Sequence, residues 1–124
     1  MRKLAAISIL LLAATPAFAE APPPVGVYEC LDQNIQINPV LMFGLLDGKT
    51  YSNYDGQTGH YRYDFKSRQL IMIDGPFEGY HYTRTEHPDP ATGADSFRML
   101  DAQGQPTAFE CPHNHVKDAH KHPW

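Results

Sequence analysis

The sequence predicts an all-β protein, an antiparallel up-and-down meander of about eight short strands that forms a small closed or nearly closed barrel. Three observations support this prediction. Short apolar or alternating runs recur between turn-forming residues, and no longer window carries a 3.6-residue period. The two cysteines, Cys30 and Cys111, fall in the first and the last of these runs. A two-sheet β-sandwich with the same meander is the alternative fold.

Residues 1–19 have the pattern of a secretory signal peptide. A basic pair at 2–3 is followed by an apolar run over 4–14, and Ala17-Phe18-Ala19 forms a small-x-small cleavage pattern. The run is too short for a membrane span, which needs about 20 apolar residues. The pattern predicts export to the periplasm or the medium, with cleavage after Ala19. Because Glu20 rather than a cysteine follows, we expect no membrane anchor.

Three parts follow the predicted cleavage point: a proline-rich lead over 20–24, a single β domain over 25–111, and a histidine-rich C-terminal tail over 112–124. Cleavage removes two basic residues and leaves 8 basic against 14 acidic residues, a net charge of −6. Nucleic acid and anionic membranes require a basic surface that this composition does not supply. We therefore expect a soluble protein that binds neither, and a monomer rather than an oligomer.

The expected strands are short and are separated by residues that favour turns. They cover roughly 25–31, 35–37, 40–46, 49–53, 59–64, 69–73, 77–84, 95–100 and 105–111. The turn signals between them are Asp47-Gly48, Asp55-Gly56, Lys66-Ser67-Arg68, Asp74-Gly75-Pro76 and the segment 101–104. Asp-Gly pairs suit type I′ hairpins, in which both central residues have positive φ.

The strand assignments rest on alternation and on apolar runs. In 59–64, Tyr61 and Tyr63 lie on one face and polar residues lie on the other, as in a half-buried strand. The run 69–73 is apolar at both faces and predicts a strand that is covered on both sides. An eight-stranded barrel is just wide enough for side chains to fill it. We therefore expect the seven tyrosines and six phenylalanines mainly in the core and at the rim.

Cys30 and Cys111 are the only cysteines, and two thiols in one small exported domain usually pair. A bridge between the first and the last strand would join the two ends of the meander. Such an arrangement favours a closed barrel over an open sheet. A redox role would need a close pair such as C-x-x-C, which the sequence lacks.

The tail carries four of the seven histidines as two H-x-H pairs, His113 with His115 and His120 with His122. Residues i and i+2 of an extended chain point the same way, so each pair can offer two imidazoles to one ion. Imidazole suits Zn(II), Cu(II) and Ni(II), and Asp118 can add an oxygen ligand. The alternative, which we favour, is a solvated extension.

The longest expected connection runs from Glu86 to Asp95 and also holds His87 and Asp89. Long loops at a barrel mouth commonly carry binding residues. This loop and the segment 45–56 are the candidate interaction loops. Their acidic residues do not have the spacing of an ordered calcium loop. No serine lies in a nucleophile motif such as G-x-S-x-G, so we expect no enzymatic activity.

Several turn and core motifs follow one another along the domain. They are Gly26-x-Tyr28-x-Cys30, a hairpin with Leu45, Asp47, Gly48 and Tyr51, the strand Gly59-x-Tyr61-x-Tyr63-Asp64, the segment Asp74-Gly75-Pro76-Phe77, and the strand of Cys111. This layout resembles an uncharacterised family of small exported proteins of Gram-negative bacteria. The resemblance implies a fold and export, and it assigns no catalytic residue.

Together these features predict an exported, non-enzymatic binding module that contacts a protein or another envelope component through its mouth loops. The alternative from another class is a periplasmic protein that binds divalent metal through its histidine tail.

Overall fold

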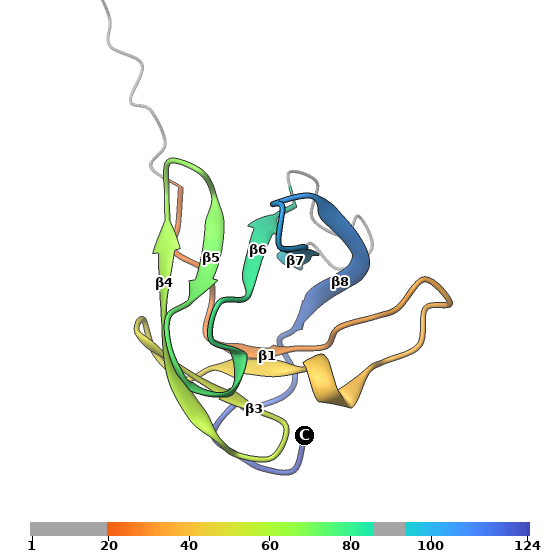
Figure 1. Cartoon of the computed structure of the whole chain (residues 1–124). Coiled ribbons are helices and arrows are strands. Elements are labelled where there is room, and N and C mark those ends of the chain that lie inside the picture. The colour runs from red at the N-terminus through yellow and green to blue at the C-terminus, as the bar shows by residue number, and fades with distance from the viewer. Residues whose placement is uncertain (1–19, 86–93) are drawn as a thin grey trace, which may run out of the picture.

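The computed structural model describes residues 20–85 and 94–124, and these form a closed antiparallel β-barrel (Figure 1). Its strands are β1 (Gly26–Tyr28), β2 (Phe43–Leu45), β3 (Thr50–Asn53), β4 (Thr58–Asp64), β5 (Gln69–Met72), β6 (His81–Arg84), β7 (Ser96–Leu100) and β8 (Pro106–Asn114). Two single-turn 3-10 helices, η1 (Pro39–Leu41) and η2 (Gly75–Phe77), lie in the connections. The predicted barrel is confirmed, and the sandwich alternative is not adopted.

Each strand pairs with the next one in sequence, and β1 pairs with β8 to close the barrel. The closing pair has Val27 opposite Asn114 and Tyr28 opposite His113. This order places successive connections at alternate ends of the barrel. The connections 29–42, 54–57 and 73–80 therefore lie at one end, and 46–49 and 65–68 lie at the other.

Aromatic rings fill the barrel interior. Tyr28, Phe43, Tyr82 and Phe97 are fully buried, and Tyr28 stacks on Phe43 with ring centroids 5.1 Å apart. The ring of Phe97 meets that of Tyr28 edge-on, with centroids 5.5 Å apart, which is an energetically favourable geometry for two aromatic rings. Leu45, Leu70 and Met72 complete the same cluster. The tyrosines and phenylalanines of the alternating strands thus form the core, as expected.

The disulfide joins Cys30, just beyond β1, to Cys111 in β8 with an S–S distance of 2.08 Å. Backbone hydrogen bonds on both sides hold the same two segments together, from the Glu29 amide to the Pro112 carbonyl and from the Leu31 amide to the Glu110 carbonyl. The bridge spans 81 residues. On the chain-entropy account, a loop of that length stabilises the folded state by about 4–5 kcal/mol.

The strand expected over 25–31 ends at Tyr28, and the one expected over 105–111 extends to Asn114. Three further expected strands contain other structure, and prolines account for two of these differences. The run 40–46 contains η1 before the short strand β2, and the run 77–84 begins inside η2 and joins β6 only at His81. Pro39 and Pro76 lie in the first turn of these helices, where a fixed φ and a missing amide are tolerated. The third, 35–37, is a loop whose sole ladder contact is the bridge between Leu31 and Ile37.

The prediction of type I′ turns at the Asp-Gly pairs is wrong. Gly56 has a φ of 81°, but Asp47, Gly48 and Asp55 are not left-handed. Instead, the Asp47 carboxylate accepts hydrogen bonds of 2.7 Å from the amides of both Lys49 and Thr50. These amides hold the pKa of Asp47 below its usual value. Side-chain capping of the turn thus replaces the left-handed geometry.

The strand over 69–73 is covered on one side rather than on two. Leu70 and Met72 point into the core and are buried, whereas Ile71 is half-buried and Ile73 is 47% exposed. The expectation of double coverage was wrong because apolar residues at successive positions do not show whether a second layer exists. Among the described residues, no helix is long and apolar enough to cross a membrane.

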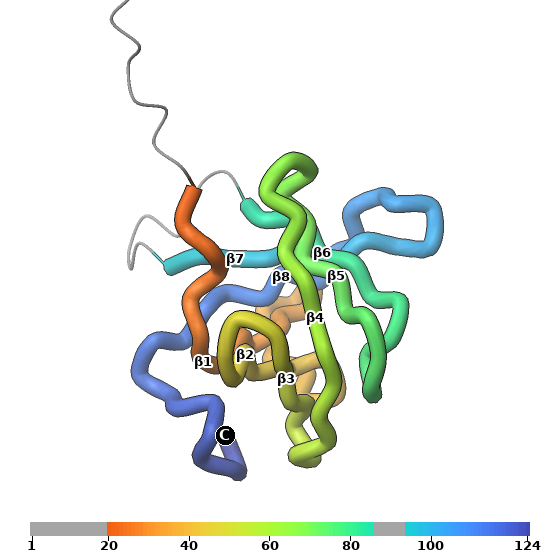
Figure 2. The backbone as a smooth tube through the Cα atoms, turned by 90° about the vertical axis from the view of Figure 1, so that its left-hand side faces the viewer, coloured from red at the N-terminus to blue at the C-terminus, as the bar shows by residue number. Residues whose placement is uncertain are grey.

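Part of the tail packs against the barrel, where we expected a solvated extension, although most of the residues after Asn114 are exposed. β8 continues to Asn114, and the chain then turns back beside β1 and β2 (Figure 2). Ala119 is buried against Val27 and Met42 on the outer surface of these strands, with Trp124 packed beside them. Gly44 leaves the space for this contact, because a Cβ there would lie 2.7 Å from the Trp124 ring. The tail is therefore part of the folded unit.

Candidate binding surface

The structure separates the four predicted metal ligands into different environments. His113 is half-buried against Tyr28, and its Nε2 lies 3.1 Å from the Val25 carbonyl oxygen, to which it donates. Burial lowers the pKa of His113. The His115 ring lies 6.4 Å from that of His113 and is exposed.

The second histidine pair contacts the barrel. His120 Nε2 donates to the Leu46 carbonyl at 3.0 Å, and His122 Nε2 lies 3.1 Å from the Ser52 hydroxyl and stacks on Trp124. Within residues 20–85 and 94–124, no group of three or more His, Cys, Asp or Glu side chains could hold a metal ion. Binding of Zn(II), Cu(II) or Ni(II) by this tail stays a prediction.

The second candidate site was the loop 86–95. Glu86, His87 and Asp89 lie outside the described residues, so the structure places only Asp95. Asp95 accepts a hydrogen bond of 2.9 Å from Nε of Arg84, a side chain that is only 6% exposed. Asp95 is thus one of the carboxylates that neutralise a buried cation.

The same cation approaches the lead segment. Arg84 lies 3.4 Å from the Glu20 carboxylate, which also accepts a hydrogen bond of 2.8 Å from Arg68. Burial would raise the pKa of Glu20, but the bonds from Arg68 and Tyr63 outweigh it and hold that pKa below its usual value. A buried charge with this set of partners is typical of a structural network.

The third candidate, the segment 45–56, is not one loop. It consists of the end of β2, the turn 46–49, all of β3 and the start of the next turn. The turns 46–49 and 54–57 lie at opposite ends of the barrel, because one strand separates them. The part that includes Tyr54 and Asp55 lines a groove with exposed apolar groups.

That part belongs to a surface we call the acidic end, formed by the connections 31–42, 54–57 and 73–80. It holds four carboxylates and no lysine, arginine or histidine: Asp32, Asp55, Asp74 and Glu78. A groove of about 460 Å³ crosses it. The groove is lined by Pro39, Val40, Asn53, Tyr54, Asp55, Gln57, Pro76, Phe77 and Tyr80. The acidic end thus combines negative charge with an apolar and aromatic depression.

Tyr51 supports the wall of this groove from inside the barrel. Its hydroxyl donates to the Asp74 carbonyl at 2.6 Å and accepts from the Phe77 amide at 2.8 Å. The Phe77 ring stacks between Tyr51 and Tyr80, with centroid distances of 5.8 and 5.3 Å. Gly75 has a φ of 80°, and a Cβ there would lie 2.6 Å from the Gly59 backbone. The connection 73–80 is therefore held in one conformation.

The connection that follows β1 projects from the barrel as an orange loop in Figure 1. Its tip residue, Ile35, is 79% exposed and has a φ of 60°. A β-branched residue rarely adopts this left-handed conformation, because its Cβ crowds the following carbonyl. The Asp32 carboxylate accepts bonds from the amides of Asn34 and Gln36 at 2.8 and 3.0 Å. The tip is therefore an ordered turn.

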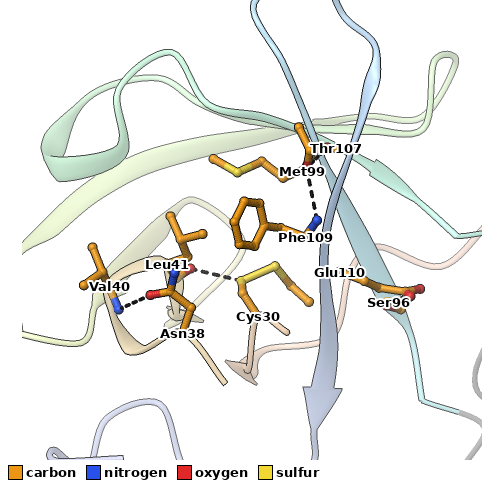
Figure 3. Close-up of a disulfide and its surroundings, with 10 residues drawn as sticks. Cys30, Asn38, Val40, Leu41, Ser96, Met99, Thr107, Phe109 and Glu110 are labelled. Carbon is orange, nitrogen blue, oxygen red and sulfur yellow. Dashed lines mark hydrogen bonds between the residues drawn. A yellow bond between two sulfur atoms is a disulfide. The ribbon is translucent and has the colours of Figure 1, made fainter. Parts of the chain in front are cut away.

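The base of the loop is tied to the disulfide (Figure 3). The Asn38 amide donates to the Cys30 carbonyl at 2.8 Å, and the Asn38 side chain caps η1 by accepting from the Val40 amide at 3.1 Å. The Cys30 sulfur lies 3.0 Å from the Leu41 carbonyl oxygen. Val40, between these contacts, is 76% exposed. The loop thus presents aliphatic side chains on a braced backbone.

The sequence predicts a strand over 35–37 where the structure has this projecting loop. Residues 34–38 alternate amide and aliphatic side chains, a pattern typical of a strand. The signals for a turn were present in Asp32, which can cap the amides after it, and in the Asn38-Pro39 pair.

Comparisons of this chain with protein-family models, with curated proteins and with solved structures find no significant match.

Proposed function

We propose that this protein is an exported, non-enzymatic binding module whose partner docks on the acidic end. The observation that carries the proposal is the exposure of large apolar side chains around one groove. Val40 is 76% exposed there, and Tyr54 and Tyr80 are each 37% exposed. Contiguous apolar surface with a polar rim is typical of interaction sites on small proteins. The predicted signal peptide supports export to the periplasm or the medium.

Two further features support a binding role. The groove is rigid, because Tyr51, Gly75 and the stacked Phe77 fix one of its walls. Rigid surfaces lose little conformational entropy on association, so more of the contact energy appears as affinity. The sequence carries no nucleophile motif that would assign a reaction to this groove.

Site-specific photo-crosslinking of the full chain in its own cells tests the proposal. The photo-reactive residue p-benzoylphenylalanine would replace Tyr54 or Tyr80 at the acidic end, and Phe65 as a control. Phe65 is also an exposed aromatic residue, at 53%, but it lies in the turn after β4, at the other end. We expect the same product from both positions 54 and 80, none from 65, and loss of that product when Val40→Ser is added. Equal products from all three positions, or none from 54 and 80, would contradict the proposal.

A further inference from the structure

We infer that Ile35 is a preformed anchor that enters an apolar pocket on a cationic protein partner. This inference rests on the proposed function and adds to it the contact residue and the chemistry of the partner. It is carried by the backbone of the loop, by the side chains around the tip, and by the charge of the acidic end.

The backbone presents Ile35 rather than burying it. The Ile35 amide donates to the Asp32 carbonyl at 2.9 Å, and the Asp32 amide donates to the Gln36 carbonyl at 2.9 Å. These bonds hold a β-branched residue left-handed, a conformation that costs free energy and is retained mainly at functional sites. A strained backbone that leaves its side chain 79% in solvent gains no core packing in return. Presentation of that side chain to another molecule accounts for both features.

The residues around Ile35 have the composition of an interface. Gln33, Asn34 and Gln36 are exposed amides beside the tip, and Ile37 and Val40 are the next exposed aliphatic residues, at 49% and 76%. Protein interfaces combine an apolar centre that has few charges with a polar rim. A single well-placed side chain in a pocket often carries much of the binding energy. The loop therefore suits insertion of an aliphatic knob into a concave apolar site.

Charge selects the class of partner. The connections of the acidic end contain Asp32, Asp55, Asp74 and Glu78 and no lysine, arginine or histidine, and the Asp74 carboxylate lies 3.0 Å from Nδ1 of His60 on β4. Five basic residues lie instead in the turns 46–49 and 65–68 and in the tail: Lys49, Lys66, Arg68, Lys117 and Lys121. Two acidic ends would repel each other, which disfavours a second copy, and an anionic membrane would repel them too. A cationic protein would be attracted over long range.

The crosslinker at position 54 supplies the test of the anchor. Ile35→Gly removes the side chain and fits the left-handed backbone, so the fold is kept. We expect this variant to lower the yield of the position-54 product about tenfold. The matched control Val25→Ser removes an aliphatic side chain that is 56% exposed just before β1, at the other end of the barrel, and should leave the yield unchanged. An undiminished yield for Ile35→Gly would overturn the anchor while leaving the proposed function intact.

The same crosslinked product from position 54 also tests whether the partner is cationic. We expect mass spectrometry to identify a protein of positive net charge, and Asp55→Asn with Glu78→Gln to lower its capture severalfold at low salt. Within residues 20–85 and 94–124 neither of these side chains accepts a hydrogen bond, so we expect the fold to tolerate both changes. A product that is a second copy of this chain, a lipid or an acidic protein would overturn the cationic partner. Absence of any product from positions 54 and 80 would instead contradict the proposed function.

Discussion

The Asp32 carbonyl oxygen accepts a hydrogen bond of 2.9 Å from the Ile35 amide, and this bond closes the turn that projects Ile35 into solvent. The Asp32 carboxylate binds two more amides of the same turn. One acidic residue therefore fixes the tip through both its main chain and its side chain. Such a turn persists although it holds isoleucine in a conformation that favours glycine.

Ile35→Gly should stabilise the protein. The left-handed backbone costs a residue with a Cβ about 1–2 kcal/mol, and glycine avoids this cost. Glycine also raises the conformational entropy of the unfolded chain, which offsets part of the gain in stability. We expect the free energy of unfolding to rise by about 1 kcal/mol, measured by denaturant titration. Ile37→Gly is the control, because Ile37 is not left-handed and forms the bridge to Leu31. Glycine at 37 should destabilise, and a loss of stability at 35 as well would show that Ile35 has a packing role.

Two buried tyrosines should respond differently to loss of the hydroxyl. Tyr51→Phe leaves the Phe77 amide and the Asp74 carbonyl without their partner, so we expect a loss of about 1–3 kcal/mol. The Tyr82 hydroxyl is buried and has no hydrogen-bond partner among the described residues. Tyr82→Phe should therefore leave thermal stability unchanged or raise it. Equal destabilisation by both changes would contradict this account of the interior.

Gly44→Ala should loosen the tail. The added methyl would lie 2.7 Å from the Trp124 ring and 2.9 Å from the Ala119 side chain, closer than packed atoms come. Trp124 is the only tryptophan, so its fluorescence reports on the tail directly. We expect a red-shifted spectrum and stronger quenching by acrylamide in the variant. Gly48→Ala, where a Cβ meets nothing within 4 Å, should leave the spectrum unchanged.

Stability should fall as the pH drops below the usual pKa of histidine, about 6.5. Burial lowers the pKa of His113 in the folded state, so at mildly acidic pH the unfolded chain binds more protons than the folded protein. The free energy of unfolding therefore decreases from about pH 7 towards pH 5. His113→Gln should flatten this dependence, whereas His115→Gln, at an exposed position, should not. An unchanged profile for His113→Gln would show that another group is responsible.

The sequence was sufficient to predict the barrel because two kinds of signal can be read from it directly: alternation within single strands, and the positions of the two cysteines in the first and last strands. Tyr61 and Tyr63 alternate with polar residues, and Cys30 and Cys111 can close a meander only if its first and last strands are neighbours. The packing of the tail was not predictable in this way. It depends on Gly44 and Ala119 meeting in three dimensions, and neither residue carries a signal in sequence.

The candidate site was harder to predict than the fold. Period-2 alternation around Ile35 indicates a strand, and only the capping bonds of Asp32 convert it into a turn. The groove draws on Val40, Tyr54 and Tyr80, which lie in three connections far apart in sequence. The histidines of the tail were conspicuous by composition, yet the structure directs His120 and His122 to separate barrel partners.

Hydrogen–deuterium exchange of the protein with and without its crosslink-identified partner tests the central claim, that binding occurs at the acidic end. We expect slower exchange on binding in 31–42, 54–57 and 73–80, with no change in 46–49 and 65–68. Protection confined to 46–49, 65–68 or the tail would contradict it and place the binding surface elsewhere on the barrel.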